Sequence, residues 1–420
     1  MSRKAWTTLL AVVAFTALVL VVAQASAKTK LVMLHWEGPD TPLQQGVELF
    51  QQLNPDIEVE LMSASAYTDK IFTMHAGGVD FDLLYVSADV YVDWVNKGLL
   101  KDITAFLEKD PQLGKKDFFL PIETDRCAVN GRWYGIGSSW SLFQVYYNRD
   151  AFDASGLEPM PRTAEKAWSW DQYIKTAQKL TRISGQTVER YGAGRPTWWL
   201  VVQSFLLSNG GNILNPEGTQ FLLDQPVSIA VHEAINVGIN EMGVFGGSFS
   251  KGENVMHIAG SWSTGLGYGV SQLNFSVDEG VLPKFITPAT YAQGHIHSMH
   301  SNTKHPEEAW RLLRFFSSND YLGMWVKNGV WLPTTREMMR PDAFVKYHNP
   351  SFMPEGYLEY VMTYLYEVGR ARKMPVGWGD ALKVYEQGIA QVWSGERPVR
   401  TVLSEVTPQM NAILKEQQAR

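Results

Sequence analysis

The sequence predicts an α/β fold made of two doubly wound lobes that are joined by a multi-segment hinge. Three observations support this prediction. Strand patterns alternate with helix patterns over residues 30–86, a strand-like crossing at residues 136–148 leads into a second α/β region, and 420 residues suit two to three domains of about 150 residues each. Ligands of such sheets bind beyond the carboxyl ends of the strands, so we expect the functional residues there.

The first region alternates between strands and helices at the spacing of βαβ units. The expected strands are residues 30–35, 57–61 and 82–86, and the expected helices are residues 42–52 and 67–75. Leu43, Val47 and Phe50 fall on one face of the first helix, as in a helix that covers a sheet. This spacing predicts a largely parallel sheet.

The remainder of the chain continues with a second set of elements. Helices are expected at residues 170–183, 198–208 and 306–317, and extended segments at residues 249–259 and 280–286. From residue 341 onward the pattern is helical, without a strand signal. We find no internal repeat and no long linker, which favours two lobes joined by crossings over independent domains in series.

The first 27 residues have the pattern of a secretory signal peptide. Arg3 and Lys4 precede an apolar run at residues 9–23, and Ala25-Ser26-Ala27 ends it. This run is shorter than the roughly 20 residues that a membrane-spanning helix needs. We therefore expect export to the periplasm with cleavage after Ala27. Cys127, the only cysteine, lies far from this site, so the chain is not expected to be a lipoprotein.

The composition narrows the possible functions. The formal net charge is −6, which argues against a nucleic-acid-binding protein, and 45% hydrophobic with 19% charged residues is typical of a globular protein. A single cysteine cannot form an internal disulfide. The 15 tryptophans are the unusual feature, since tryptophan serves interfaces and stacking platforms.

A series of short motifs runs through the predicted mature chain. They are His35-Trp36, a helix at residues 43–54, residues 81–85 followed by residues 97–100, Asn130-Gly131-Arg132-Trp133-Tyr134-Gly135-Ile136, Tyr146-Tyr147-Asn148, residues 249–252 with Met256, Gly260-Ser261-Trp262, and residues 305–310. In this order the chain resembles the ABC-transporter extracellular solute-binding proteins of family 1, the maltose-binding-like carbohydrate receptors. Glu253 and Asn254 depart from this pattern, because the family usually has lysine and small residues there.

The resemblance implies a type II periplasmic binding protein that closes on a sugar-like solute. It implies an N-terminal lobe of residues 28–138 and 286–328, a C-terminal lobe of residues 139–285 and 329–420, and a ligand cleft between them. It further implies that the closed form is recognised by a membrane permease with its ATPase. We expect a monomer that binds a sugar, oligosaccharide or polyol, makes no bond, and needs no cofactor or metal.

Several residues combine the chemistry that a sugar requires, an apolar face for its CH groups and polar groups for its hydroxyls. Trp36 and Glu37 supply both directly after the first strand, and Ser87 and Asp89 follow the third. The resemblance aligns Asp89 with a sugar-binding aspartate of the family. Tyr67 begins the second helix and is expected to reach the cleft.

Further tryptophans lie where a cleft is expected. Trp140 is in the crossing, and Trp262 is in a glycine-rich turn at which the resemblance places a stacking tryptophan. Trp198 and Trp199 cannot share a helix face, so at most one of them, taken here as Trp199, lines the cleft. The remaining candidates, all in loops, are Trp331, Trp378 and Arg372.

Three alternatives remain open from the sequence. An anionic solute such as a sugar phosphate or uronate would need an arginine in the cleft, for which Arg195 and Arg372 are the candidates. A secreted glycoside hydrolase or lyase would need a pair of carboxylates, which the sequence does not identify. His295 and His297 lie on one face of an expected strand and would suit Zn²⁺ only with a third ligand.

Overall fold

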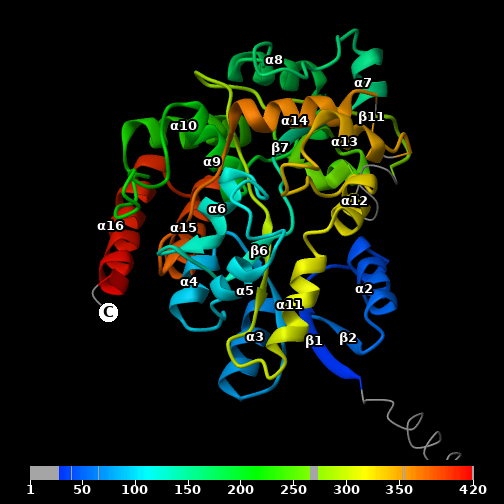
Figure 1. Ribbon diagram of the computed structural model, residues 1–420. Helices are drawn as coiled ribbons and strands as arrows, with labels where there is room; N and C mark the ends of the chain where they lie inside the picture. The colour runs from blue at the N-terminus through cyan, green and yellow to red at the C-terminus, as the bar shows by residue number, and fades with distance from the viewer. Residues whose placement is uncertain are drawn as a thin grey trace, which may run out of the picture.

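Two five-stranded sheets organise the chain, one below and one above in the view of Figure 1. The computed structural model describes residues 28–38, 40–64, 66–264, 273–351, 353 and 355–418. The predicted signal peptide lies outside the described residues. Both sheets carry helices on their faces, so the α/β class predicted from the sequence is confirmed.

The first sheet is built from both early and late parts of the chain. Its order is β2-β1-β3-β13-β6, with β1 parallel to β2 and β3, and β13 antiparallel to β3 and β6. The strands are β1 (Thr29–His35), β2 (Ile57–Ser63), β3 (Leu83–Ser87), β6 (Gly135–Gly137) and β13 (His295–Met299). The three early strands therefore form the predicted parallel unit, and β13 returns some 200 residues later to complete the sheet.

The sheet of the first region was expected to be largely parallel, but β13 makes it mixed, and the second sheet is mostly antiparallel. In its order, β11-β7-β10-β9-β8, only β9 and β10 are parallel. The strands are β7 (Phe143–Asn148), β8 (Arg182–Ser184), β9 (Thr187–Ala193), β10 (Asn254–Gly260) and β11 (Val277–Gly280). A two-residue turn with Gly185 at φ +61° joins β8 to β9 as a hairpin, which is necessarily antiparallel.

The helices mostly follow the predicted ranges. They are α2 (Pro42–Leu53), α3 (Tyr67–Ala76), α4 (Tyr91–Asn96), α5 (Thr104–Lys109), α6 (Pro121–Cys127), α7 (Arg149–Ala154), α8 (Trp170–Leu180), α9 (Trp199–Ser208), α10 (Pro226–Asn236), α11 (Pro306–Phe315), α12 (Asn319–Lys327), α13 (Pro341–Phe344), α14 (Tyr357–Val368), α15 (Trp378–Trp393) and α16 (Val399–Gln418). Leu43, Val47 and Phe50 of α2 are buried, as their spacing predicts.

Two helix predictions differ from the structure. The helix expected over residues 170–183 ends at Leu180, because residues 182–184 enter the β8–β9 hairpin. The region beyond residue 341 contains a short strand, β14 (Gly369–Arg370), which pairs with β12 (Thr290–Tyr291). A two-residue strand leaves no alternating pattern that the sequence could reveal.

The two sheets are connected by several crossing segments that lie side by side. Trp140 and Leu332 exchange two backbone hydrogen bonds of 2.9 Å, and Ser141 pairs in the same way with Gln293. The pairing of β12 with β14 adds a further crossing. The chain thus passes between the sheets more than twice, as expected for a multi-segment hinge.

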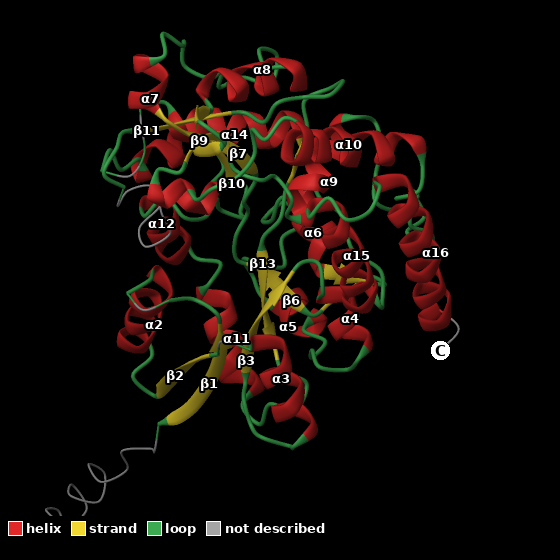
Figure 2. Cartoon of the chain, turned by 180° about the vertical axis from the view of Figure 1, so that it is seen from behind, coloured by secondary structure: helices red, strands yellow, loops and turns green. Residues whose placement is uncertain are grey.

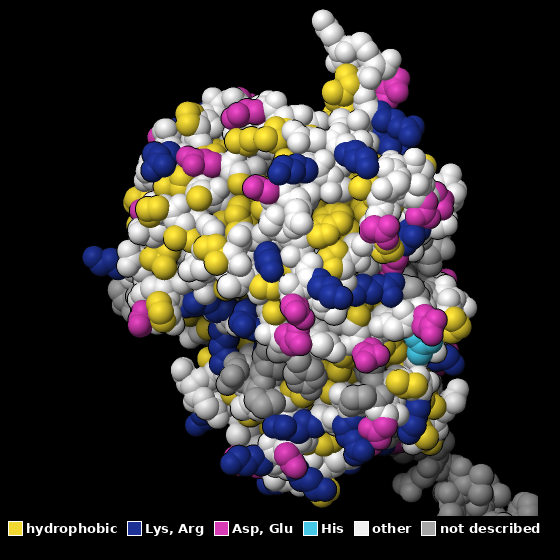
Figure 3. All heavy atoms as spheres, turned by 90° about the horizontal axis from the view of Figure 1, so that it is seen from above, with side chains coloured by type: hydrophobic (Ala, Val, Ile, Leu, Met, Phe, Trp, Pro, Cys, Tyr) yellow, Lys and Arg dark blue, Asp and Glu magenta, His cyan; other side chains and the backbone are white. Residues whose placement is uncertain are grey.

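The C-terminal helices pack along both halves. Figures 1 and 2 show α15 next to α4, and the Gly377 amide donates to Asp93 Oδ1 over 3.3 Å. The face in Figure 3, seen from above, carries Lys and Arg interspersed with Asp and Glu. This face therefore presents no field of a single sign to a partner.

Candidate functional site

A cavity of about 270 Å³ lies where the carboxyl ends of β1 and β3 meet the second sheet's turns. It is lined by Trp36, Glu37, Gly38, Ser87, Trp262, Gln293, Gly294, His295 and Trp331. Five of these residues were predicted from the sequence as solute-binding residues. The rule that ligands bind beyond strand ends therefore located the cavity.

Three tryptophans from separate segments form the aromatic part of the wall. Trp36 follows β1 and is 37% exposed, Trp262 lies in the short 3₁₀ turn Ser261–Thr264, and Trp331 follows α12. The Trp262 and Trp331 rings are 5.8 Å apart, and Trp331 lies 5.0 Å from the His295 ring, which is 5.5 Å from Trp36. Indole faces of this kind suit the apolar CH face of a sugar.

The position of Trp262 depends on a glycine. A Cβ atom added to Gly260 would lie 1.9 Å from the Trp262 ring, so the indole folds back over a backbone without a side chain. Phe143 and Trp198 contact the same indole at 5.7 and 6.0 Å between ring centroids. The side chain is therefore held in one orientation before any solute binds.

The polar part of the wall comes from the strand ends of the first sheet. Glu37 is buried, with 2% of its surface exposed, and the Ser87 hydroxyl donates to Asp89 Oδ1. Asp89, predicted as a solute-binding residue, does not line the cavity: its carboxyl lies behind Ser87, near Trp378 and Tyr291, and burial raises its pKa. Glu37 and Ser87 therefore supply the polar groups that suit the hydroxyl rim of a sugar.

His295 also lines the cavity, although sequence reasoning considered it only as a metal ligand. Its ring stacks on Tyr85 at 4.3 Å, and its Nδ1 lies 3.0 Å from Ser139 Oγ. Burial lowers the pKa of His295 well below its usual value, so the imidazole is neutral at neutral pH. Its location depends on β13 pairing with β3, a contact across some 200 residues that the local pattern does not reveal.

Tyr67 supports the cavity wall without lining it. Its hydroxyl lies 2.9 Å from the carbonyl oxygens of Leu34 and Tyr85 and accepts from the Tyr85 amide at 2.9 Å. Its ring stands edge-on to Trp36 at 5.2 Å. Tyr67 therefore joins the ends of β1 and β3 and braces the indole that follows β1.

Three predicted tryptophans lie in the core, away from the cavity wall. Trp140 is 1% exposed beneath the Arg126 guanidinium, which lies 4.1 Å from the indole. Trp199 and Trp378 are 5% and 0% exposed and pack against each other at 4.9 Å. Trp140 in the crossing segment and Trp199 and Trp378 at the first residues of α9 and α15 all point into the core. Their positions along the sequence do not indicate this orientation.

Of the two adjacent tryptophans it is Trp198, not Trp199, that faces outward, although it does not line the cavity. It is the N-cap residue of α9, is 45% exposed, and contacts Trp262. Because α9 begins at Trp199, the next indole points into the core while Trp198 stays outside the first turn. The one-residue difference reverses the expected assignment.

Arg372 lines a second cavity of about 500 Å³ that adjoins the same crossing segments. The cavity is lined by Ala88, Arg126, Pro216, Glu217, Gly218, Tyr291, Ala292, Ala371, Arg372 and Lys373. The Arg372 guanidinium donates to the carbonyls of Leu214, Asn215 and Pro216. These bonds anchor the loop and use much of the donor capacity that an anionic solute would require.

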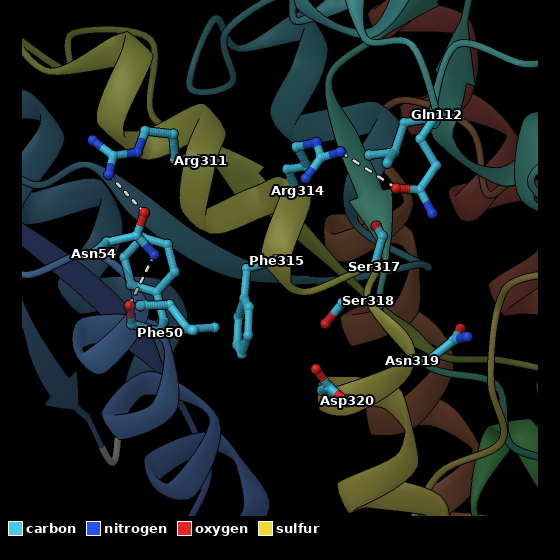
Figure 4. Close-up of a pocket in the computed structure, with 12 residues that line it drawn as sticks. Phe50, Asn54, Gln112, Arg311, Arg314, Phe315, Ser317, Ser318, Asn319 and Asp320 are labelled. Carbon is cyan, nitrogen blue, oxygen red and sulfur yellow. Dashed lines mark hydrogen bonds between the residues drawn. The ribbon is translucent and has the colours of Figure 1, made fainter.

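A third cavity, of about 470 Å³, lies on the outside of the first sheet between α2, α11 and α12 (Figure 4). Its arginines are engaged within the protein. Arg311 pairs with Asp56 and Asn54, and Arg314 with Asp110 and Gln112. None of the predicted binding residues lines this cavity, so we assign no solute to it.

The part of the chain that the structure describes contains neither a metal-ligand cluster nor a membrane-spanning helix. Within those residues, no three His, Cys, Asp or Glu side chains group as metal ligands would. His295 and His297 are both buried, and their rings pack 5.4 Å apart within the aromatic core. No helix among the same residues has the length and apolar character to span a membrane.

Comparison with known proteins assigns the family. The family profile of the bacterial extracellular solute-binding proteins matches residues 36–322, which is more than half of the chain. The chain belongs to this family. A Brucella abortus (strain 2308) relative described as a binding protein is 23% identical in an alignment of 414 positions, which covers 94% of this chain and 92% of the relative.

Solved structures share the fold of this solute-binding protein. An ABC substrate-binding protein of Listeria monocytogenes in complex with cycloalternan superposes with a TM-score of 0.82 at 21% identity, over 92% of this chain and 99% of that one. Maltose-bound MalE3 of T. maritima gives 0.74 at 18% identity, over 92% and 100%. The predicted type II periplasmic binding protein fold is therefore confirmed.

Proposed function

We propose that this solute-binding protein is the periplasmic substrate-binding component of an ABC importer for a sugar, oligosaccharide or polyol. The observation that carries the proposal is the cavity lined by the indoles of Trp36, Trp262 and Trp331 together with Glu37 and His295. Apolar faces beside hydrogen-bonding groups match the two surfaces of a sugar ring. The cycloalternan and maltose complexes of structural neighbours support the same solute class.

The cavity residues come from both halves of the chain, which supports capture by hinge closure. Trp36, Glu37, Ser87 and His295 belong to the first sheet's strand ends, whereas Trp262 follows a strand of the second sheet. We assign residues 28–138 and 286–328 to the N-terminal lobe, and residues 139–285 and 329–420 to the C-terminal lobe. A solute that contacts both walls stabilises the closed arrangement.

We further propose that the protein is exported to the periplasm and works there with a membrane permease. The pattern of residues 1–27 supports export with cleavage after Ala27, and Cys127 is too far from that site for lipidation. The protein then acts as a monomer in the periplasm and delivers its solute to the permease and ATPase without chemical change. Release of products from incubated oligosaccharides would contradict this role and favour a hydrolase.

A fluorescence and scattering titration tests the proposal. Maltose, maltotriose, mannotriose and tagatose are added to the protein while tryptophan emission and radius of gyration are recorded. We expect at least one of them to bind saturably, to change the emission and to compact the protein. Binding that weakens steeply with added salt would favour an anionic solute instead, and the absence of any response would count against the sugar proposal.

A matched pair of variants localises the binding. Trp262→Ala removes a cavity indole, whereas Trp168→Ala removes a half-buried indole that stacks on Phe152 away from the cavity. Loss of one stacking face costs about 1–3 kcal/mol, or about 5- to 150-fold in affinity. We expect this loss for Trp262→Ala alone. Equal effects of the two variants would show that the cavity is not the site.

A further inference from the structure

The turn that carries Trp262 rests on a buried cluster of polar side chains from three other elements. Gln144 and Tyr146 come from β7, Glu279 from β11, and Tyr357 and Tyr360 from α14. Thr264, the last residue of the turn, is the point at which their contacts meet. Its Oγ1 lies 2.8 Å from Tyr146 Oη, 3.0 Å from Tyr357 Oη and 3.5 Å from Glu279 Oε1.

Two phenols of this cluster hold the beginning of the turn. The Tyr146 hydroxyl donates to the Gly260 carbonyl at 3.0 Å, and the Tyr357 hydroxyl donates to the Ser261 carbonyl at 3.4 Å. These two carbonyls directly precede Trp262. Both phenol protons are therefore used on the backbone that positions the indole, and each phenol has only one proton to donate.

Glu279 is buried beside this arrangement, with 2% of its surface exposed. Its Oε2 has no hydrogen-bond partner among the described residues. The nearest cation, Arg162, is engaged with Asp278 and with the carbonyls of Glu279 and Glu355. A carboxylate in such surroundings is costly, so the protonated form is favoured.

Several titratable and charged groups surround Glu279. The groups that face it are Asp278 on the same strand, Arg162 before α8, Tyr146 on β7, and Tyr357 and Tyr360 on α14. Burial raises the pKa of all three tyrosines above the usual value of 10. Burial and the Asp278 charge raise the pKa of Glu279 to about 8, so its carboxyl titrates between pH 7 and 9, below the range of the three phenols.

We propose that Glu279 is a positioning residue whose protonated carboxyl keeps the Trp262 turn in its binding conformation, and that loss of this proton weakens solute binding. Ionisation places a negative charge beside the Thr264 hydroxyl, which links Glu279 to the two phenols. The Thr264 hydroxyl contacts both Glu279 Oε1 and Tyr357 Oη but has a single proton, so the charge draws that proton to the carboxylate. The Tyr357 and Tyr146 phenols then lose their present arrangement around Thr264 and loosen their bonds to the Ser261 and Gly260 carbonyls, which releases the turn. The effect on affinity rests on the proposed function, whereas the effect on the turn does not.

The first test therefore needs no solute. The protein is labelled with 5-fluorotryptophan, the Trp262 resonance is assigned with Trp262→Phe, and its ¹⁹F shift is followed from pH 6 to 10. We expect the shift to titrate with a midpoint near pH 8 in the wild type and to stay constant in Glu279→Gln, which mimics the neutral acid. A titration that persists in Glu279→Gln, or none in the wild type, would overturn the proposal.

A pair of buried tyrosines on α14 controls for general loosening. Tyr357→Phe removes the bond to the turn, whereas Tyr364→Phe removes a hydroxyl that accepts from the Leu282 amide and does not contact the turn. We expect the Trp262 resonance to move or broaden only in Tyr357→Phe. Equal changes in both variants would mean that the cluster stabilises the lobe without positioning the indole.

The second test measures affinity for whichever of maltose, maltotriose, mannotriose and tagatose binds. We expect the wild type to bind that probe at least about threefold more weakly at pH 9 than at pH 7, and Glu279→Gln to bind it equally at both pH values. Equal pH dependence in the two proteins would overturn the proposal. If none of the four sugars binds, the proposed function fails, and the ¹⁹F titration still decides the role of Glu279.

Discussion

Removing one charge from the buried pair Glu123–Arg126 is the sharpest test of how the hinge is held together. Arg126 NH2 donates to both carboxylate oxygens of Glu123, at 2.7 and 2.8 Å, and NH1 donates to the Ser139 carbonyl at 2.9 Å. The Arg126 and Glu123 side chains are 5% and 0% exposed. The pair thus ties α6 to the crossing segment that also carries Trp140.

The substitution Glu123→Gln removes the charge while it preserves the volume, so no cavity contributes to the result. The guanidinium stays buried above the Trp140 ring, without a counter-ion. Removing one partner of a buried ion pair costs about 3–5 kcal/mol, because the remaining charge is left uncompensated. We expect the free energy of unfolding to fall by this amount.

Equilibrium unfolding in urea, followed by tryptophan fluorescence, measures the loss. The comparison is valid if the dependence on urea concentration is the same in variant and wild type. Asp80→Asn is the matched control, since it removes the carboxylate of the Lys304 pair, in which the side chains are 69% and 64% exposed. Exposed pairs contribute about 0–1 kcal/mol. A Glu123→Gln loss no larger than that of the control would refute the reasoning.

Three further predictions follow from the same geometry. A Cβ atom at Gly294 would lie 1.9 Å from the Ser139 carbonyl oxygen, so Gly294→Ala should lower the free energy of unfolding by about 1–3 kcal/mol, as measured by urea denaturation. Gly379→Ala is the control, because a Cβ atom there has nothing within 4 Å and should change this free energy little. Between about pH 5 and 7.5 Glu279 is ionised in the unfolded chain but protonated in the native protein, because burial raises its native pKa to about 8. The free energy of unfolding should therefore fall by about 1.4 kcal/mol per pH unit as the pH rises through this range. Urea titrations at several pH values should show that Glu279→Gln removes this part of the pH dependence. Cys127 is fully buried, and burial together with the nearby Glu123 raises the pKa of its thiol. A thiol reagent at pH 8 should therefore label Cys127 only after denaturant is added. Labelling of the native protein would contradict the position of Cys127 in the core.

Local patterns predicted the parts of the fold that local contacts determine. The early strands, α2 with its buried Leu43, Val47 and Phe50, and the glycine-rich turn at Trp262 each follow from residues close together in the chain. The cavity position followed from them, because the carboxyl ends of β1 and β3 share one edge of the sheet. The antiparallel pairing of the second sheet could not be predicted from local patterns, since strand direction depends on which distant strands pair.

The individual side chains at the site depended on finer details than a sequence pattern contains. Whether Trp198 or Trp199 faces outward is set by a one-residue choice of where α9 begins. Trp140 was expected at the cleft because its segment crosses there, but the buried guanidinium of Arg126 occupies the space over its ring. The positions of His295 and Glu279 could not be predicted because they depend on the pairing of β13 with β3 and of β11 with β7.

The same crossing segments therefore carry two kinds of tryptophan with separable effects. Trp140 packs inside the hinge, where Gly137 and Gly294 leave room for the Glu123–Arg126 pair: a Cβ atom at Gly137 would lie 1.8 Å from Glu123 Oε2. Trp331 lies on the strand-like segment paired with this one, close to Leu332, yet faces the cavity. Trp140 lies inside the crossing and Trp331 lines the cavity, where it also packs on Trp262, His295 and Trp325. Substitutions at Trp140 should therefore alter stability and closure, whereas substitutions at Trp331 should in addition lower solute affinity directly. A high tryptophan content alone thus does not identify a sugar site, whereas the side of the crossing on which each indole lies does.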